Sequence, residues 1–62
     1  MSTADFYHQN AASERLAASK ADLPNRRRQH EQSAERWEQM ARAAEETERR
    51  TLINEAQKRA FR

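Results

Sequence analysis

The chain has 62 residues, of which 12 are Lys or Arg and 10 are Asp or Glu, and its formal net charge is +2. It contains neither glycine nor cysteine, which excludes a glycine-rich phosphate loop, disulfides, thiol catalysis and zinc–thiolate sites. A chain of this length buries too little surface to build an enclosed active site, so we expect neither an enzyme nor a bound cofactor.

A first helix is predicted from about residue 4 to residue 21. Ser2 or Thr3 can cap its N-terminus, and Asp5 lies in the first turn, where the helix dipole favours an anion. Glu14 interrupts an otherwise apolar stripe. The members of this stripe share one helix face by their spacing: Tyr7, Ala11, Ala18 and Ala21.

The only proline, Pro24, marks the break in this pattern. Proline disfavours helical geometry at the preceding residue and is well suited to the first turn of a helix. We therefore predict a turn at residues 22–24, with the N-cap of a second helix at Asp22 or Leu23. Two helices joined in this way form an all-α helical hairpin, which we expect to assemble into an antiparallel helical bundle.

The second helix is predicted from about residue 24 to residue 48, with residues up to 60 either continuing it or frayed. Its inner stripe has helical spacing: His30, Ala34, Trp37, Ala41 and Ala44. At Glu48 the apolar spacing of this stripe is interrupted. A different face follows, rotated by roughly a quarter turn: Leu52, Ile53, Ala56 and Ala60. Because no glycine or proline interrupts the segment, continuation of the helix is favoured.

A hairpin bent at residues 23–24 sets Tyr7 near Met40. The first helix then ends opposite about residue 46, and the last ~15 residues overhang by ~20 Å. Four apolar residues of this overhang would have no partner in their own chain: Leu52, Ile53, Ala56 and Phe61. The sequence therefore predicts a small non-catalytic interaction protein that uses these residues to form a homodimer or to dock on a protein partner.

Basic residues gather in two places and define an alternative function, a small RNA- or DNA-binding hairpin. The three arginines after Asn25 point in different directions around a helix, whereas the last fourteen residues hold five basic residues against one acidic residue. The candidate phosphate contacts are Arg26, Arg27, Arg28, Arg49, Arg50, Lys58, Arg59 and Arg62. Membrane binding is disfavoured, because few apolar side chains are available to insert.

The two histidines, His8 and His30, lie near opposite ends of the predicted hairpin, so we expect no metal site. His30 is predicted to lie in the helix interface, opposite Glu14. Trp37 is predicted to be a buried anchor. The serines have no local oxyanion-hole device, so no catalytic residue is assigned.

No run of apolar residues approaches the ~20 needed to cross a bilayer. The N-terminus also lacks the basic start and apolar core of a secretion signal. A cytoplasmic location is expected.

The pattern Tyr7-x-x-x-Ala11, followed by Pro24-x-x-Arg27-x-x-His30-x-x-x-Ala34-x-x-Trp37-x-x-Met40-Ala41, resembles short helical-hairpin proteins of alphaproteobacteria. The resemblance covers about residues 5–45 and does not include the basic extension after Glu48. It implies a bacterial protein with a hairpin fold. That group has no assigned activity, so the resemblance leaves function open.

Overall fold

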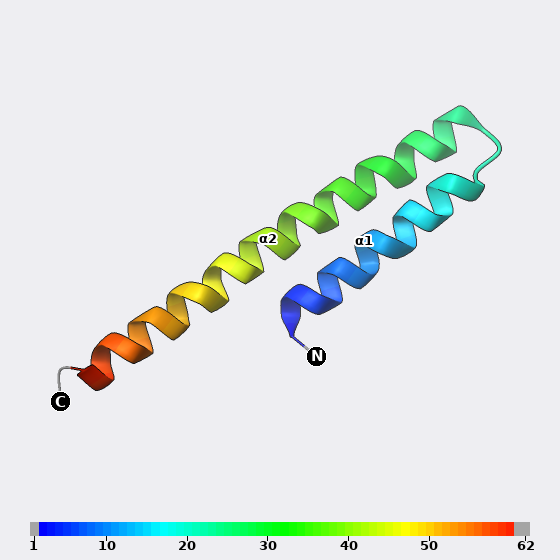
Figure 1. Ribbon diagram of the computed structural model, residues 1–62. Coiled ribbons are helices and arrows are strands. Elements are labelled where there is room, and N and C mark those ends of the chain that lie inside the picture. The colour runs from blue at the N-terminus through cyan, green and yellow to red at the C-terminus, as the bar shows by residue number, and fades with distance from the viewer. Residues whose placement is uncertain (1, 61–62) are drawn as a thin grey trace.

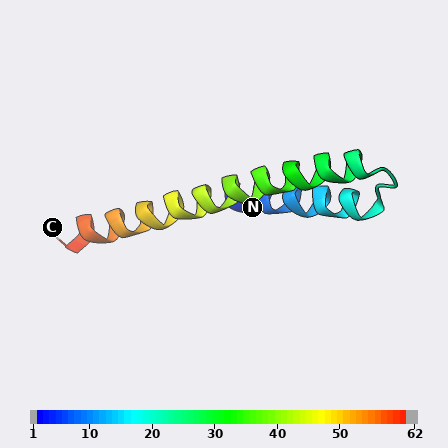
Figure 2. The same cartoon turned by 90° about the horizontal axis from the view of Figure 1, so that it is seen from above.

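The computed structural model describes residues 2–60, which form two antiparallel α-helices joined by a short turn (Figure 1). Helix α1 spans Thr3–Lys20 and helix α2 spans Pro24–Ala60. The predicted all-α hairpin, with a short helix, a proline turn and a long helix, is confirmed. Two views at right angles show α2 continuing well past the N-terminal end of α1 (Figures 1 and 2).

The start of α1 is fixed by a capping box. The Ser2 hydroxyl accepts a hydrogen bond from the Asp5 amide at 3.1 Å, and the Asp5 carboxylate accepts one from the Ser2 amide at 3.3 Å. Because Ser2 is the N-cap, the helix begins one residue earlier than predicted. At the other end Ala21 has an extended backbone and is the C-cap, so the helix also ends one residue earlier.

The turn is closed by main-chain and side-chain bonds to two carbonyls. The Leu23 carbonyl accepts from the Arg27 amide at 3.0 Å, which makes Leu23 the N-cap of α2, one of the two positions predicted. The Arg27 guanidinium also donates to the Ala21 carbonyl at 3.3 Å. One of the three consecutive arginines is therefore engaged in the turn.

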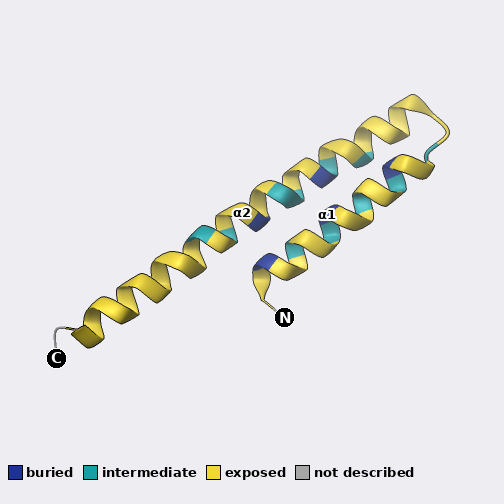
Figure 3. Cartoon of the chain, in the orientation of Figure 1, coloured by how far each residue is buried: buried dark blue, intermediate teal, exposed yellow. Residues whose placement is uncertain are grey.

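The interface between α1 and α2 is built from alanines (Figure 3). Their spacing of seven within each helix keeps them on the facing sides of the hairpin. The prediction that Trp37 is a buried anchor is wrong, because alanine-lined helices approach too closely to admit an indole, and Trp37 lies half-buried at the edge. The buried residues are Ala4, Ala11, Ala18, Ala34 and Ala41.

The hairpin is a thin rod of 60 × 17 × 9 Å with a radius of gyration of 16.7 Å, whereas a compact domain of this length would have about 11 Å. Its accessible surface is 5285 Å², about 1,100 Å² more than a compact monomer of the same mass exposes. This excess, together with the exposed apolar side chains, indicates association with a partner or with further copies. Within residues 2–60 neither helix combines the length and apolar character needed to cross a membrane.

Candidate interaction surfaces

Side-chain contacts between α1 and α2 line one side of the helix interface. Arg15 donates two hydrogen bonds to Glu38, at 2.9 and 3.1 Å. His8 contacts Glu45 farther along the same side. The hydrogen bond from Arg15 lowers the pKa of the Glu38 carboxyl, and the same bond raises the pKa of the Arg15 guanidinium. These contacts hold α1 in register against α2.

Both histidines are paired with a glutamate from the opposite helix. His30 Nδ1 lies 2.7 Å from Glu14 Oε2, so the predicted contact between these residues is confirmed. Glu14 interrupts the apolar stripe of α1 because it meets this half-buried histidine. Across residues 2–60, no group of three or more potential metal ligands converges. Both histidines contact the opposite helix.

An aromatic cluster, formed by Phe6, Tyr7 and Trp37, lies at the edge of the helix interface. The ring centroids of Phe6 and Trp37 are 6.2 Å apart in an edge-to-face arrangement, and those of Tyr7 and Trp37 are 5.8 Å apart. Phe6 remains 52% exposed. The sequence reasoning missed Phe6 because it lies off the apolar stripe, although its position beside Tyr7 was a usable signal.

A groove of about 380 Å³ opens next to this cluster, where α1 begins. Tyr7 and Met40 both line it, as their predicted proximity requires. Thr3 lines it together with Glu48, so α1 begins close to residue 48 of α2. The remaining lining residues are Ala43, Ala44 and Thr47.

Residues 49–60 form a helical arm that extends past α1, and all of them are exposed (Figure 3). At 100° per residue the apolar side chains of the arm gather within about 100° of its circumference. Leu52 is 66% exposed and Ile53 is 50% exposed. We name this set the apolar edge: Leu52, Ile53, Ala56 and Ala60. Phe61, predicted to belong with it, lies outside the described residues.

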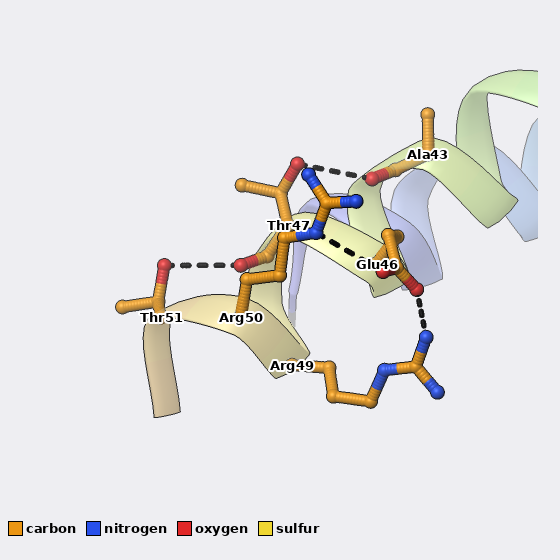
Figure 4. A network of polar contacts seen from close by, with 6 residues as sticks. All are labelled: Ala43, Glu46, Thr47, Arg49, Arg50 and Thr51. Carbon is orange, nitrogen blue, oxygen red and sulfur yellow. Dashed lines mark hydrogen bonds and ion pairs between the residues drawn. The ribbon is translucent and has the colours of Figure 1, made fainter. Parts of the chain in front are cut away.

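Figure 4 shows the polar contacts within α2 at the base of the arm. Glu46 accepts hydrogen bonds from both Arg49 and Arg50. The hydroxyls of Thr47 and Thr51 donate to the carbonyls one turn earlier, at 3.1 and 3.0 Å. Both threonine hydroxyls are thus satisfied within the helix, which leaves their methyl groups on its surface.

The basic residues predicted for nucleic-acid binding do not form one cluster. Arg26 and Arg28 are exposed at the turn, while Arg49 lies about 35 Å farther along α2 at 1.5 Å per residue. Arg59 lies 3.9 Å from Glu55, and Arg49 shares Glu46 with its neighbour. Arg62 lies outside the described residues. Any phosphate-binding surface must therefore be defined by helix face rather than by sequence cluster.

Comparison of the chain with protein families, with curated proteins and with solved structures finds no match in any of the three. The resemblance to alphaproteobacterial hairpin proteins accordingly stays a prediction.

Proposed function

We propose that this chain is a small non-catalytic helical interaction protein that docks through the apolar edge of its arm, on a second copy of itself or on another protein. The observation that carries the proposal is the combination of an ordered helix and unpaired apolar side chains. Leu52 and Ile53 are at least half exposed, on the part of α2 (residues 49–60) in which the structure describes every residue as exposed.

The amount of exposed surface supports this function. A stable protein–protein interface buries about 800 Å² on each partner, and the chain exposes about 1,100 Å² more than a compact monomer would. The hairpin therefore carries enough surplus surface to supply one side of an ordinary interface. In a chain that remained a monomer, covering the arm with another helix would add stability. Helix α1 is too short to cover it.

The helical state of the arm lowers the cost of binding. A segment that is already helical loses less conformational entropy on docking than a disordered one. Leu52 and Ala56 are four residues apart, and Ile53 and Ala60 are seven apart. This is the spacing with which an amphipathic helix enters an apolar groove.

Sedimentation equilibrium of the full chain over a wide concentration range tests the proposal. Leu52→Gln/Ile53→Gln removes the apolar edge without changing charge or helix propensity appreciably, and we expect it to abolish association. Thr51→Gln/Asn54→Gln is the matched control, because it places the same side chains on another side of the same arm. A chain truncated after Glu48 should behave like the first variant.

The two possible partners give different results. A dimer that is lost in Leu52→Gln/Ile53→Gln means that the edge pairs with a second copy. A monomer at all concentrations directs the search to a different protein, with the same two variants as bait and control. If the truncated chain keeps both its mass and its partner binding, the proposed function is wrong.

A further inference from the structure

The polar residues of α2 are segregated by type around its circumference. At 100° per residue, one arc of about 140° contains no glutamate at all. The same arc contains every asparagine and glutamine of the helix: Asn25, Gln29, Gln32, Gln39, Asn54 and Gln57. It also carries four basic residues: Arg26, Arg36, Arg50 and Lys58. We name this surface the amide face.

The acidic residues of α2 occupy the rest of the helix. Glu38 and Glu45 face α1, where they pair with Arg15 and His8. Glu46 borders the amide face on one edge and Glu55 borders it on the other, and Glu48 lies in the groove beside the start of α1. A chain with a net charge of only +2 thus presents one long side from which carboxylates are absent.

All the amide and basic residues of this face are exposed. Arg26, Arg36, Arg50 and Lys58 follow one another at intervals of about 15, 21 and 12 Å, for a total of about 48 Å along the axis. Arg50 shares Glu46 with Arg49 and remains 75% exposed. Exposed pairs of this kind contribute little to stability, so a competing anion displaces them readily.

The groove opens at the edge of the amide face, about midway along it. Met40 and Thr47 belong to both surfaces, and Tyr7 contributes an aromatic ring from α1. Because the Thr47 hydroxyl is bonded to the Ala43 carbonyl, its methyl group faces outward. Phe6, half exposed beside the groove, adds a second ring. An aromatic platform therefore adjoins a row of cations.

We propose that the amide face binds a single-stranded nucleic acid along its length. The four cations contact phosphates, the amide side chains donate and accept hydrogen bonds at base edges, and a base stacks on the rings at the groove. A basic track combined with stacking platforms is the usual chemistry of sequence-tolerant single-strand binding. Glutamine and asparagine supply polarity without the repulsion that a carboxylate would exert on phosphate.

This inference is independent of the proposed function, because the apolar edge and the amide face lie on different sides of the arm. A duplex is a poorer ligand, since its bases are not available to the aromatic rings. An acidic protein could pair with the four cations, but it has no bases to stack on the rings at the groove or to pair with the six amides. A strand of about 14 stacked nucleotides at 3.4 Å each would span the four cations.

The test is fluorescence anisotropy with the full chain and a labelled single-stranded RNA of about 16 nucleotides. Arg36→Gln/Arg50→Gln/Lys58→Gln removes three cations from the amide face. Arg42→Gln/Arg49→Gln/Arg59→Gln removes the same charge from the other sides of α2 and is the matched control. Circular dichroism checks that both variants remain helical.

Four phosphate contacts predict that log K falls with log salt with a slope of about −3 for a single strand. We expect the amide-face variant to lose more than about tenfold in affinity near 50 mM salt and about 2 units of that slope, and the control variant to lose less than about threefold. Gln39→Glu, which changes an amide to a carboxylate of the same size, should weaken binding severalfold, whereas Gln9→Glu on α1 should not.

Three results would overturn the proposal. The first is absence of binding even at about 20 mM salt, where electrostatic contacts are strongest. The second is an equal loss in the two triple variants, which would mean diffuse attraction rather than a face. The third is binding of the annealed duplex as tightly as the single strand. Leu52→Gln/Ile53→Gln should leave RNA affinity unchanged, so failure of one proposal does not decide the other.

Discussion

Arg15 and Glu38 form two parallel hydrogen bonds across the helix interface, from Nε to Oε1 at 2.9 Å and from Nη2 to Oε2 at 3.1 Å. In a hairpin whose core consists of alanines, few side chains are long enough to connect the helices. This bidentate pair adds a geometrically specific contact between α1 and α2.

The pair makes hairpin stability depend on pH in the acid range. The hydrogen bond from Arg15 lowers the pKa of Glu38 in the folded chain. The contribution of the Arg15–Glu38 pair to stability is therefore present above the pKa that Glu38 has in the unfolded chain, about 4.3. It is lost as the pH falls through the lower pKa that Glu38 has in the folded chain. We expect Glu38→Gln to lower the melting temperature at pH 7 and to match the parent chain near pH 3.

Thermal melting followed by circular dichroism from pH 7 to pH 3 checks this expectation. Glu55→Gln is the control, because Glu55 is exposed and belongs to the arm, which extends past α1. A constant difference between Glu38→Gln and the parent chain across the whole range would mean that the carboxylate charge does not matter.

The alanine interface should tolerate no enlargement. Ala41 is 0% exposed, so leucine at this position must push the helices apart, and overpacking of this kind typically costs about 1–3 kcal/mol. Ala12→Leu, at an exposed position of α1, should change the free energy of unfolding by less than about 0.5 kcal/mol. Urea titration measures both. If Ala41→Leu left the free energy of unfolding unchanged, the helices would be packed less closely at this position than the structure shows.

The sequence predicted the hairpin well and its interface less well. Pro24 and the stripe from His30 to Ala44 were sufficient to place the turn and the inner face of α2, since both depend on local geometry. The exclusion of Trp37 from the core depends on how closely two alanine-lined helices approach, which is a property of the pair.

The apolar edge could be predicted from the sequence, whereas the amide face could not. Exposure of Leu52 followed from the difference in helix length, which can be counted along the chain. The amide face was missed because its members are far apart in sequence, from Asn25 to Lys58. Reading the chain in consecutive blocks emphasised Arg26–Arg28 and the basic tail instead. The residues of the amide face can be assigned to one side of α2 only when the helix is known to be continuous through Thr51 to Ala60.

The capping box should contribute measurably to so small a fold. Ser2 provides the only side chain that accepts a hydrogen bond from the first amides of α1 among the described residues. Ser2→Ala should destabilise the hairpin by about 0.5–2 kcal/mol. Thr3→Ala is the control, because Thr3 lies inside the helix and lines the groove. Equal losses in the two variants would show that the cap has no special role.

Phe6 should control the environment of the only tryptophan. Its ring meets Trp37 edge to face at 6.2 Å and covers part of an indole that the alanine interface cannot bury. Phe6→Ala should therefore shift the Trp37 emission to longer wavelength. Because Phe6 is already 52% exposed, its loss should cost about 1 kcal/mol, well below the 3–5 kcal/mol typical of a buried phenylalanine.

Leu16→Ala, at a position 57% exposed and outside the aromatic cluster, should leave the emission unchanged. An unshifted spectrum in Phe6→Ala would mean that solvent already reaches the indole freely, and the aromatic cluster would then lose its role as a platform.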